Sequence, residues 1–205
     1  GTPCVAAHSV VRALYDDYSG PLYAVRRLTD QQTQDVNTLH AGGVADAASQ
    51  DRYCASSGCS IATIYDQSPQ GNHLIAGPGR RGHVDLEVNA SKDALTLNGQ
   101  KVYSASFEKT TAYPNSTCSV PPCEHAKEVG VGYRIDNTTG IAKGDEPETL
   151  YMVTSGQHFN AGCCFDYGNV ETFIGDAGPG TMEAISITND RRGTMHGSHH
   201  GQGPG

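Results

Sequence analysis

Two adjacent cysteines, Cys163 and Cys164, are the feature that most constrains how this chain can fold. Neighbouring Cα atoms lie only about 3.8 Å apart, which is shorter than the roughly 4.4 to 6.8 Å that an ordinary disulfide spans. A bond between these two cysteines would close a small strained ring that braces no distant segment and presents a rigid, apolar sulfur surface. The alternative is that each cysteine pairs elsewhere, because spacing alone does not determine connectivity.

The remaining cysteines fall mainly into close pairs. The chain has 7 cysteines, and Cys54 with Cys59 and Cys118 with Cys123 are each spaced to clip a tight loop. Local pairing leaves the two adjacent cysteines for each other and Cys4 without a partner. In an oxidising compartment we expect Cys4 to bond to a cysteine outside this chain, in a preceding stretch or in a second polypeptide.

Acceptor motifs for N-glycosylation begin at Asn89, Asn115 and Asn137. Their polar surroundings suit exposed loops. Together with the paired cysteines they predict a secreted, extracellular protein. The sequence holds no apolar run long enough to cross a membrane and no signal peptide, so we expect the signal to have been removed.

Composition narrows the fold class and the partners. With 205 residues the chain can build one substantial core, yet 25 glycines, 10 prolines and no tryptophan describe a loop-rich chain rather than a helix bundle. The 14 Lys and Arg residues against 22 Asp and Glu residues give a net charge of −8 without a basic stripe, which argues against nucleic acid. A neutral substrate such as a glycan fits this charge better.

Hydrophobic spacing predicts a helix only near the start of the chain, within His8–Leu22. Beyond it, short strands separated by Gly, Pro, Asn and Asp turns are expected over residues 60–65, 94–97, 150–154 and 182–188. Asn98-Gly99, followed by residues 100–103, is a hairpin signal. The spacing therefore predicts a mainly β protein, an antiparallel β-sandwich with long loops and disulfide clips.

The last stretch, residues 193–205, is rich in glycine and histidine and predicts a flexible tail or loop. His196, His199 and His200 are metal-ligand types, but a glycine-rich backbone does not preorganise them, so we expect no metal site. The sequence also lacks calcium-loop, zinc, phosphate-loop and nucleophile-elbow patterns, and we expect no cofactor. Redox catalysis by the adjacent cysteines is disfavoured by their acidic neighbourhood.

Several stretches resemble, in order and over nearly the whole chain, the N-terminal part of the fungal-type α-L-arabinofuranosidase B catalytic domain, glycoside hydrolase family 54. The most specific of them is Cys163-Cys-Phe-Asp-Tyr-Gly-Asn169. The others are residues 40–51, 64–74, 96–101, 144–146 and 182–185.

The resemblance implies a secreted, concanavalin-like β-sandwich that removes terminal α-L-arabinofuranosyl residues from arabinoxylan, arabinan or related glycans with retention of configuration. It implies a vicinal Cys163–Cys164 disulfide that lines the sugar pocket, with Phe165 and Met182 in the pocket wall. A flat apolar plate suits the hydrophobic face of a furanose. The resemblance also matches Cys54 and Cys59 to a small disulfide loop and Cys4 to a cysteine whose usual partner lies just upstream.

The chain departs from the family in its catalytic groups. Retaining hydrolysis needs two carboxyl groups about 5 to 5.5 Å apart, and the resemblance implies that both lie C-terminal to Gly205. The acids near the expected pocket are more consistent with turn, hydrogen-bonding or solvent-facing roles; they are Asp166, Glu171, Asp176 and Glu183. Residues 107–131, with Cys118, Cys123 and the Asn115 motif, resemble an inserted, glycosylated surface loop.

These observations leave three hypotheses for the function of the chain. In the first, the chain is one piece of an arabinofuranosidase, completed by further polypeptide or by a second chain. In the second, it is a noncatalytic carbohydrate-binding or structural subunit that keeps the fold. In the third, it is a small cysteine-stapled interaction domain without a glycan ligand. A partial sandwich would expose strand edges and apolar surface, which favours the first.

Overall fold

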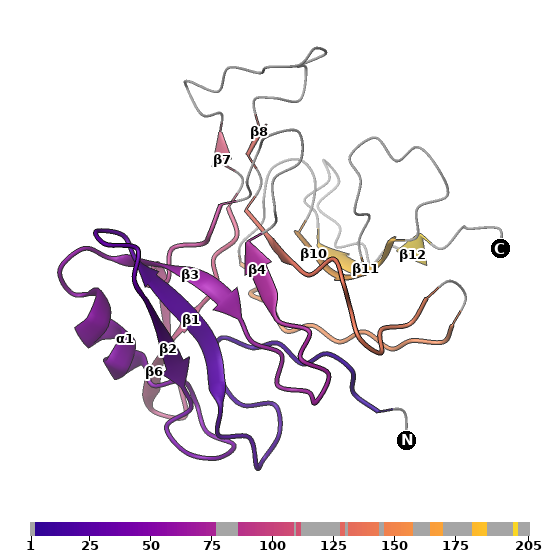
Figure 1. Ribbon diagram of the computed structural model, residues 1–205, viewed down its shortest axis with the longest axis horizontal. Coiled ribbons are helices and arrows are strands. Elements are labelled where there is room, and N and C mark those ends of the chain that lie inside the picture. Colours follow the sequence, from indigo (N-terminus) through magenta and orange to yellow (C-terminus); the bar gives the residue numbers. More distant parts are fainter. Residues whose placement is uncertain are drawn as a thin grey trace. The chain divides into compact units, whose positions relative to one another are not determined.

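The computed structural model describes residues 3–76, 86–108, 110–111, 128–129, 131–143, 146–157, 165–169, 182–187 and 199–200. The chain divides into two compact units, residues 1–141 and residues 142–205. Its described elements are almost all strands, and every ladder between them is antiparallel (Figure 1). The predicted mainly β, antiparallel fold class is confirmed. Among the described residues, no helix is long and apolar enough to cross a membrane.

A five-stranded sheet forms the centre of the first unit, in the order β2-β1-β3-β4-β9. Its strands are β1 (Pro21–Arg27), β2 (Thr33–Asn37), β3 (Cys59–Ile64), β4 (Leu74–Ala76) and β9 (Tyr133–Arg134). The rest of the unit holds the helix α1 (Ala47–Cys54) and two further strand pairs, β5 (Asp93–Leu97) with β6 (Gln100–Ser104), and β7 (Thr110–Thr111) with β8 (Glu128–Val129).

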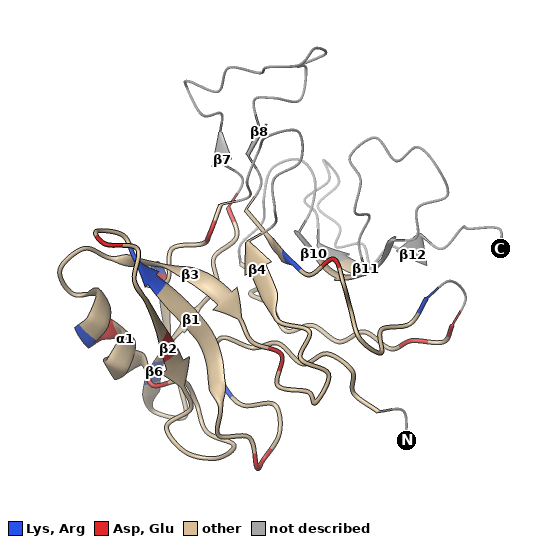
Figure 2. Ribbon diagram, in the orientation of Figure 1, with Lys and Arg blue, Asp and Glu red and all other residues tan. Residues whose placement is uncertain are grey.

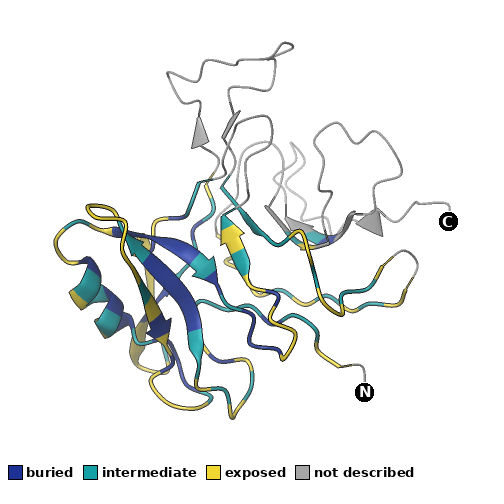
Figure 3. Ribbon diagram, in the orientation of Figure 1, coloured by how far each residue is buried: buried dark blue, intermediate teal, exposed yellow. Residues whose placement is uncertain are grey.

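The core lies along the two central strands, which Figure 3 shows as long buried stretches. Four consecutive residues of β1, Leu22 to Val25, are buried, and so are the first four of β3, Cys59 to Ala62. Burial of successive residues means that both faces of these strands are covered, because side chains alternate between faces. Tyr23 pairs with Ile64 and Val25 with Ile61 across the β1–β3 ladder, so large apolar side chains meet in the middle of the sheet.

Helix α1 is fixed at both ends. The Asp46 carboxylate accepts a hydrogen bond from the Ser49 amide at 2.9 Å and caps the first turn. The last residue, Cys54, is joined by a disulfide to Cys59 at the start of β3, with a Cα–Cα distance of 5.5 Å. The sequence predicted this pair. Inside the core, Gln50 accepts a hydrogen bond from the Tyr23 hydroxyl at 2.6 Å and ties the helix to β1.

The Asn98-Gly99 hairpin is confirmed as the turn between β5 and β6. Both residues have positive φ, 52° and 75°, as a two-residue type I′ turn requires. The ladder pairs Leu97 with Gln100 directly across the turn. The predicted strands at residues 60–65, 94–97 and 182–188 correspond to β3, β5 and β11.

Two predictions of secondary structure are wrong. Residues 8–20 form no helix, because distant segments bond their backbone: the Ala13 amide donates to the Gly43 carbonyl, and the Ala45 amide to the Val11 carbonyl. Residues 150–154, expected as a strand, belong to no ladder.

The second unit holds a three-stranded antiparallel sheet in the order β10-β11-β12. The strands are β10 (Phe165–Asn169), β11 (Met182–Ile187) and β12 (His199–His200). Of the expected flexible stretch 193–205, His199 and His200 thus pair with β11, and the remainder lies outside the described residues.

Candidate functional site

The residues expected to face a sugar are located at the β10–β11 ladder. Phe165 is the first residue of β10 and pairs with Ile187. Cys163 and Cys164, which directly precede Phe165, lie outside the described residues, as do Cys118, Cys123 and Asn115. The two adjacent cysteines therefore directly precede strand β10 in the sequence. The disulfide bond between them stays a prediction.

The ladder does not bring Phe165 and Met182 together. Phe165 lies opposite Ile187, whereas Met182 is at the other end of β11, paired with His200. Five residues of strand separate these ends, which is about 17 Å. Positions 165 and 182 also fall on opposite faces, because cross-strand partners share a face and neighbours alternate. The register therefore does not place these two positions on one face of the ladder.

The same register separates the carboxylates near this sheet. Asp166 pairs with Ser186, and Glu183 pairs with Asn169 and His199. Positions 166 and 183 therefore lie on opposite faces and about 10 Å apart along the strands, which does not match a retaining pair. Glu171 and Asp176 lie outside the described residues.

Two of the three histidines of the last stretch belong to a described strand. His199 and His200 are adjacent residues of β12. His196 lies outside the described residues. No group of three His, Cys, Asp or Glu side chains in the described segments is close enough to hold a metal ion.

A buried carboxylate, Asp66, organises the stretch 64–74 that carries part of the family resemblance. One of its oxygens accepts hydrogen bonds from the Ala7 and Ser68 amides, both at 2.8 Å. The other accepts from the Ser68 hydroxyl at 2.7 Å and from the Asn72 amide at 2.8 Å. Burial alone would raise the pKa of Asp66, but these hydrogen bonds outweigh it and lower the pKa below its ordinary value. All its acceptor directions serve the fold, so this acid is structural.

Asn72 extends this network to both ends of the first unit. Its side-chain amide donates to the Val5 and Thr139 carbonyls, both at 2.8 Å, and its side-chain oxygen accepts from the Thr139 amide at 2.8 Å. The His8 ring bonds to the Asn72 carbonyl through Nε2 at 2.7 Å. A carbonyl only accepts, so Nε2 carries the proton. We call the five residues Asp66, Ser68, Asn72, His8 and Thr139 the Asp66 network. Sequence reasoning did not find it.

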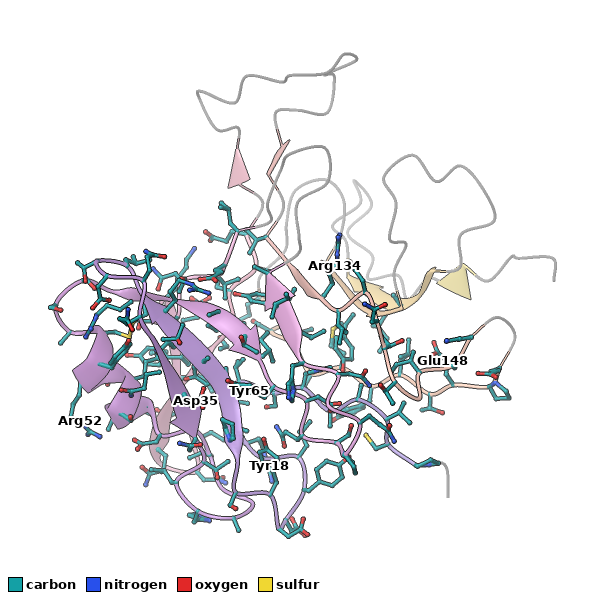
Figure 4. All side chains as sticks on the ribbon, in the orientation of Figure 1. Tyr18, Asp35, Arg52, Tyr65, Arg134 and Glu148 are labelled. Carbon is teal, nitrogen blue, oxygen red and sulfur yellow. A yellow bond between two sulfur atoms is a disulfide. The ribbon has the colours of Figure 1, made fainter. Side chains whose placement is uncertain are left out.

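A second polar group lies on the surface of the five-stranded sheet. Figure 4 shows Tyr65 beside Asp35, to whose carboxylate its hydroxyl donates at 2.8 Å. Burial and this hydrogen bond raise the pKa of Tyr65 to about 12. Tyr18 donates its hydroxyl to the Pro21 carbonyl at 2.7 Å. Both phenols therefore already serve internal contacts.

The described glycosylation motifs and Cys4 are accessible. Asn89 and Asn137 are exposed, as their acceptor role requires. Cys4 is an exposed free thiol within this chain. Among the described residues, Lys, Arg, Asp and Glu are dispersed over helix α1, loops and strands (Figure 2).

Comparison with known proteins identifies the chain's relatives. The family model "Alpha-L-arabinofuranosidase B, catalytic" matches residues 1–130 and 124–205. The chain is 45% identical to the probable α-L-arabinofuranosidase B of Aspergillus terreus, with 100% of this chain and 37% of that protein aligned. It is 44% identical to α-L-arabinofuranosidase B of Penicillium canescens, over 100% of this chain and 40% of that protein. The chain thus spans well under half the length of these relatives.

Solved structures of the same kind share the fold. An arabinofuranosidase complexed with arabinofuranosyl-α-1,2-xylobiose matches with a TM-score of 0.76 at 43% identity, over 91% of this chain and 36% of that one. A glycoside hydrolase family 54 α-L-arabinofuranosidase soaked with a cyclic sulfate inhibitor matches with a TM-score of 0.74 at 44% identity, over the same shares. With the family model matching along the whole sequence, the chain belongs to the α-L-arabinofuranosidase B catalytic-domain family.

Proposed function

We propose that the protein of which this chain forms part is a secreted glycoside hydrolase that removes terminal α-L-arabinofuranosyl residues from arabinoxylan- or arabinan-type glycans. The observation that carries the proposal is the match of the arabinofuranosidase B catalytic model to the entire chain. The solved relative complexed with an arabinofuranosyl-xylobiose supports an arabinofuranosyl glycan as the substrate class. The exposed Asn89 and Asn137 motifs support secretion.

This chain contributes the N-terminal part of the β-sandwich and a surface that contacts the sugar. The apolar plate formed by the Cys163–Cys164 disulfide, with Phe165 beside it, packs against the apolar face of the furanose. The nucleophile and the acid/base are supplied by polypeptide beyond Gly205. Two observations support this division: Asp166 and Glu183 occupy opposite faces of the ladder, and the relatives are much longer than this chain.

The direct test is hydrolysis of 4-nitrophenyl α-L-arabinofuranoside by the purified full-length protein. We expect turnover with the α-anomer as the first product by proton NMR, since a retaining mechanism inverts the anomeric carbon twice. First appearance of the β-anomer would contradict retention. Binding of arabinoxylan without any turnover would establish the noncatalytic carbohydrate-binding reading instead.

The plate is tested by the double substitution Cys163→Ser and Cys164→Ser in the full-length protein. Loss of an apolar sugar contact is expected to lower kcat/KM about 10- to 100-fold. The matched control is Cys54→Ser with Cys59→Ser, which also removes a disulfide pair but at the end of helix α1. The control should lower thermal stability and leave KM unchanged. Equal kinetic losses in both variants would rule out a specific role for the plate.

A further inference from the structure

Residues 149–153 have the side-chain pattern of a strand. Leu150 and Met152 are half-buried, whereas Thr149, Tyr151 and Val153 are exposed. This alternation with a period of two is the pattern of extended β structure. Two of the three exposed side chains are large and apolar: Tyr151 and Val153 are 77% and 80% accessible.

No described strand pairs with this segment. The described sheet of the same unit consists of β10, β11 and β12, and its described ladders involve residues 165–169, 182–187 and 199–200. An extended segment outside a ladder presents backbone donors and acceptors that can accept a new strand.

The composition of the segment indicates a strand that is covered on both faces. A strand with one wet face carries polar residues there, whereas a strand buried on both sides is apolar throughout. Residues 150–153 read Leu-Tyr-Met-Val, without a charged or amide side chain. Leu150 and Met152 are already half-buried, so Tyr151 and Val153 are the apolar side chains of this segment that remain exposed.

We propose that in the full-length protein the polypeptide following Gly205 lies along residues 149–153, pairs with their backbone and covers Tyr151 and Val153. The relatives supply the reason for this occupant: the solved arabinofuranosidases are chains of which this one covers 36%, so most of each lies outside the matched part. Residues 150–153 carry no charged or amide side chain that could orient sugar hydroxyls, so this face fits a strand of the same domain better than a glycan. The proposal does not depend on the catalytic activity.

The occupant is identified by photocrosslinking in the full-length protein. Position 151 takes p-benzoylphenylalanine in place of tyrosine, which keeps an aromatic ring. We expect crosslinked peptides that join position 151 to residues beyond 205 of the same chain. The control is the same replacement at Leu28, an apolar side chain that is also exposed, at 54%, but lies in the turn after β1. Crosslinks to a second copy, or only to residues 1–205, would overturn the proposal.

Hydrogen exchange of the unsubstituted full-length protein gives an independent answer. The amides of residues 150–153 should exchange about 100-fold or more slowly than those of the exposed residues 155–157, at every protein concentration. Rapid exchange of residues 150–153 would overturn the proposal. So would protection that disappears on dilution, which indicates a second copy, or that develops only when arabinoxylan is added.

Discussion

Asp66 shows at the scale of one residue how a buried charge can be fully satisfied by the chain itself. Its side chain is buried, yet it accepts four hydrogen bonds from three residues, Ala7, Ser68 and Asn72. Hydrogen bonds to a charged group contribute more than neutral ones, and an unmet buried donor is costly. The carboxylate therefore stabilises the loop between β3 and β4 and the segment before β1 at the same time.

Replacing Asp66 by asparagine is expected to lower the free energy of unfolding by about 2 to 4 kcal/mol. The amide nitrogen would face backbone donors that need an acceptor, so buried N–H groups would lose their partners. The measurement is the urea midpoint of the full-length protein. Asp35→Asn is the control, because Asp35 is exposed and accepts a hydrogen bond from Tyr65 at the surface. A similar loss in both variants would show that burial of the acceptor is not what matters.

At the scale of elements, turn chemistry sets the geometry of the β5–β6 hairpin. Asn98 and Gly99 both take left-handed backbone conformations, which favour asparagine and glycine over other residues. A Cβ atom added at Gly99 would meet no heavy atom within 4 Å. Glycine is therefore required at position 99 because of the backbone conformation, and not because neighbouring atoms would crowd a side chain.

We expect Gly99→Ala to destabilise the protein by about 1 kcal/mol, because alanine must adopt positive φ. Gly156→Ala is the matched control, since its Cβ would also meet nothing within 4 Å and its φ is not positive. The control should change the thermal midpoint by far less. If both alanines behave alike, the strained turn is not the origin of the effect.

The elements also show which parts of the fold the sequence can predict. The strands β3, β5 and β11 and the β5–β6 turn follow from short apolar runs and from Asn-Gly, which are local signals. The helix predicted within His8–Leu22 failed because the Ala13 and Leu14 amides bond to Gly43 and to the Gln67 side chain, partners that spacing cannot reveal. Residues 149–153 have the alternation of a strand, but alternation does not say where the partner strand lies.

The candidate site, like the fold, was predictable only where the signal is local in the sequence. Cys163 and Cys164 could be predicted as site residues because they are adjacent in the sequence. The separation of Phe165 from Met182 could not be predicted, because it depends on the register of the β10–β11 ladder. The sequence did not reveal the Asp66 network because its members are remote in sequence: His8 lies 64 residues from Asn72, and Thr139 lies 67 residues from Asn72.

At the scale of the whole molecule, His8 links stability to pH. Burial lowers the pKa of His8, and this outweighs the hydrogen bond to Asn72 and the nearby Asp66 charge, which raise it, while His73 lowers it further. The folded protein therefore holds His8 neutral, whereas the unfolded chain binds a proton near pH 6.5. The unfolded state carries more protons below that pH, so stability must fall as the pH drops below about 6.5.

His8→Gln should flatten this pH dependence, because an amide can still donate to the Asn72 carbonyl but does not titrate in this range. Urea midpoints of the full-length protein between about pH 7.5 and 5.5 provide the measurement. His40→Gln is the control: His40 is exposed and its ring nitrogen contacts only the adjacent Ala41 carbonyl among the described hydrogen bonds. If the urea midpoint of His8→Gln still falls with decreasing pH as it does in the unsubstituted protein, other groups cause the pH dependence of stability.

The side chain of Asn72 also sets an order of events during synthesis. Its amide holds Val5, made 67 residues earlier, and Thr139, made 67 residues later. At about 5 to 20 residues per second, translation needs on the order of several seconds to reach Thr139 after Asn72 has been added. Until Thr139 has been synthesised, the Asn72 side chain can bond to Val5 but lacks its second partner.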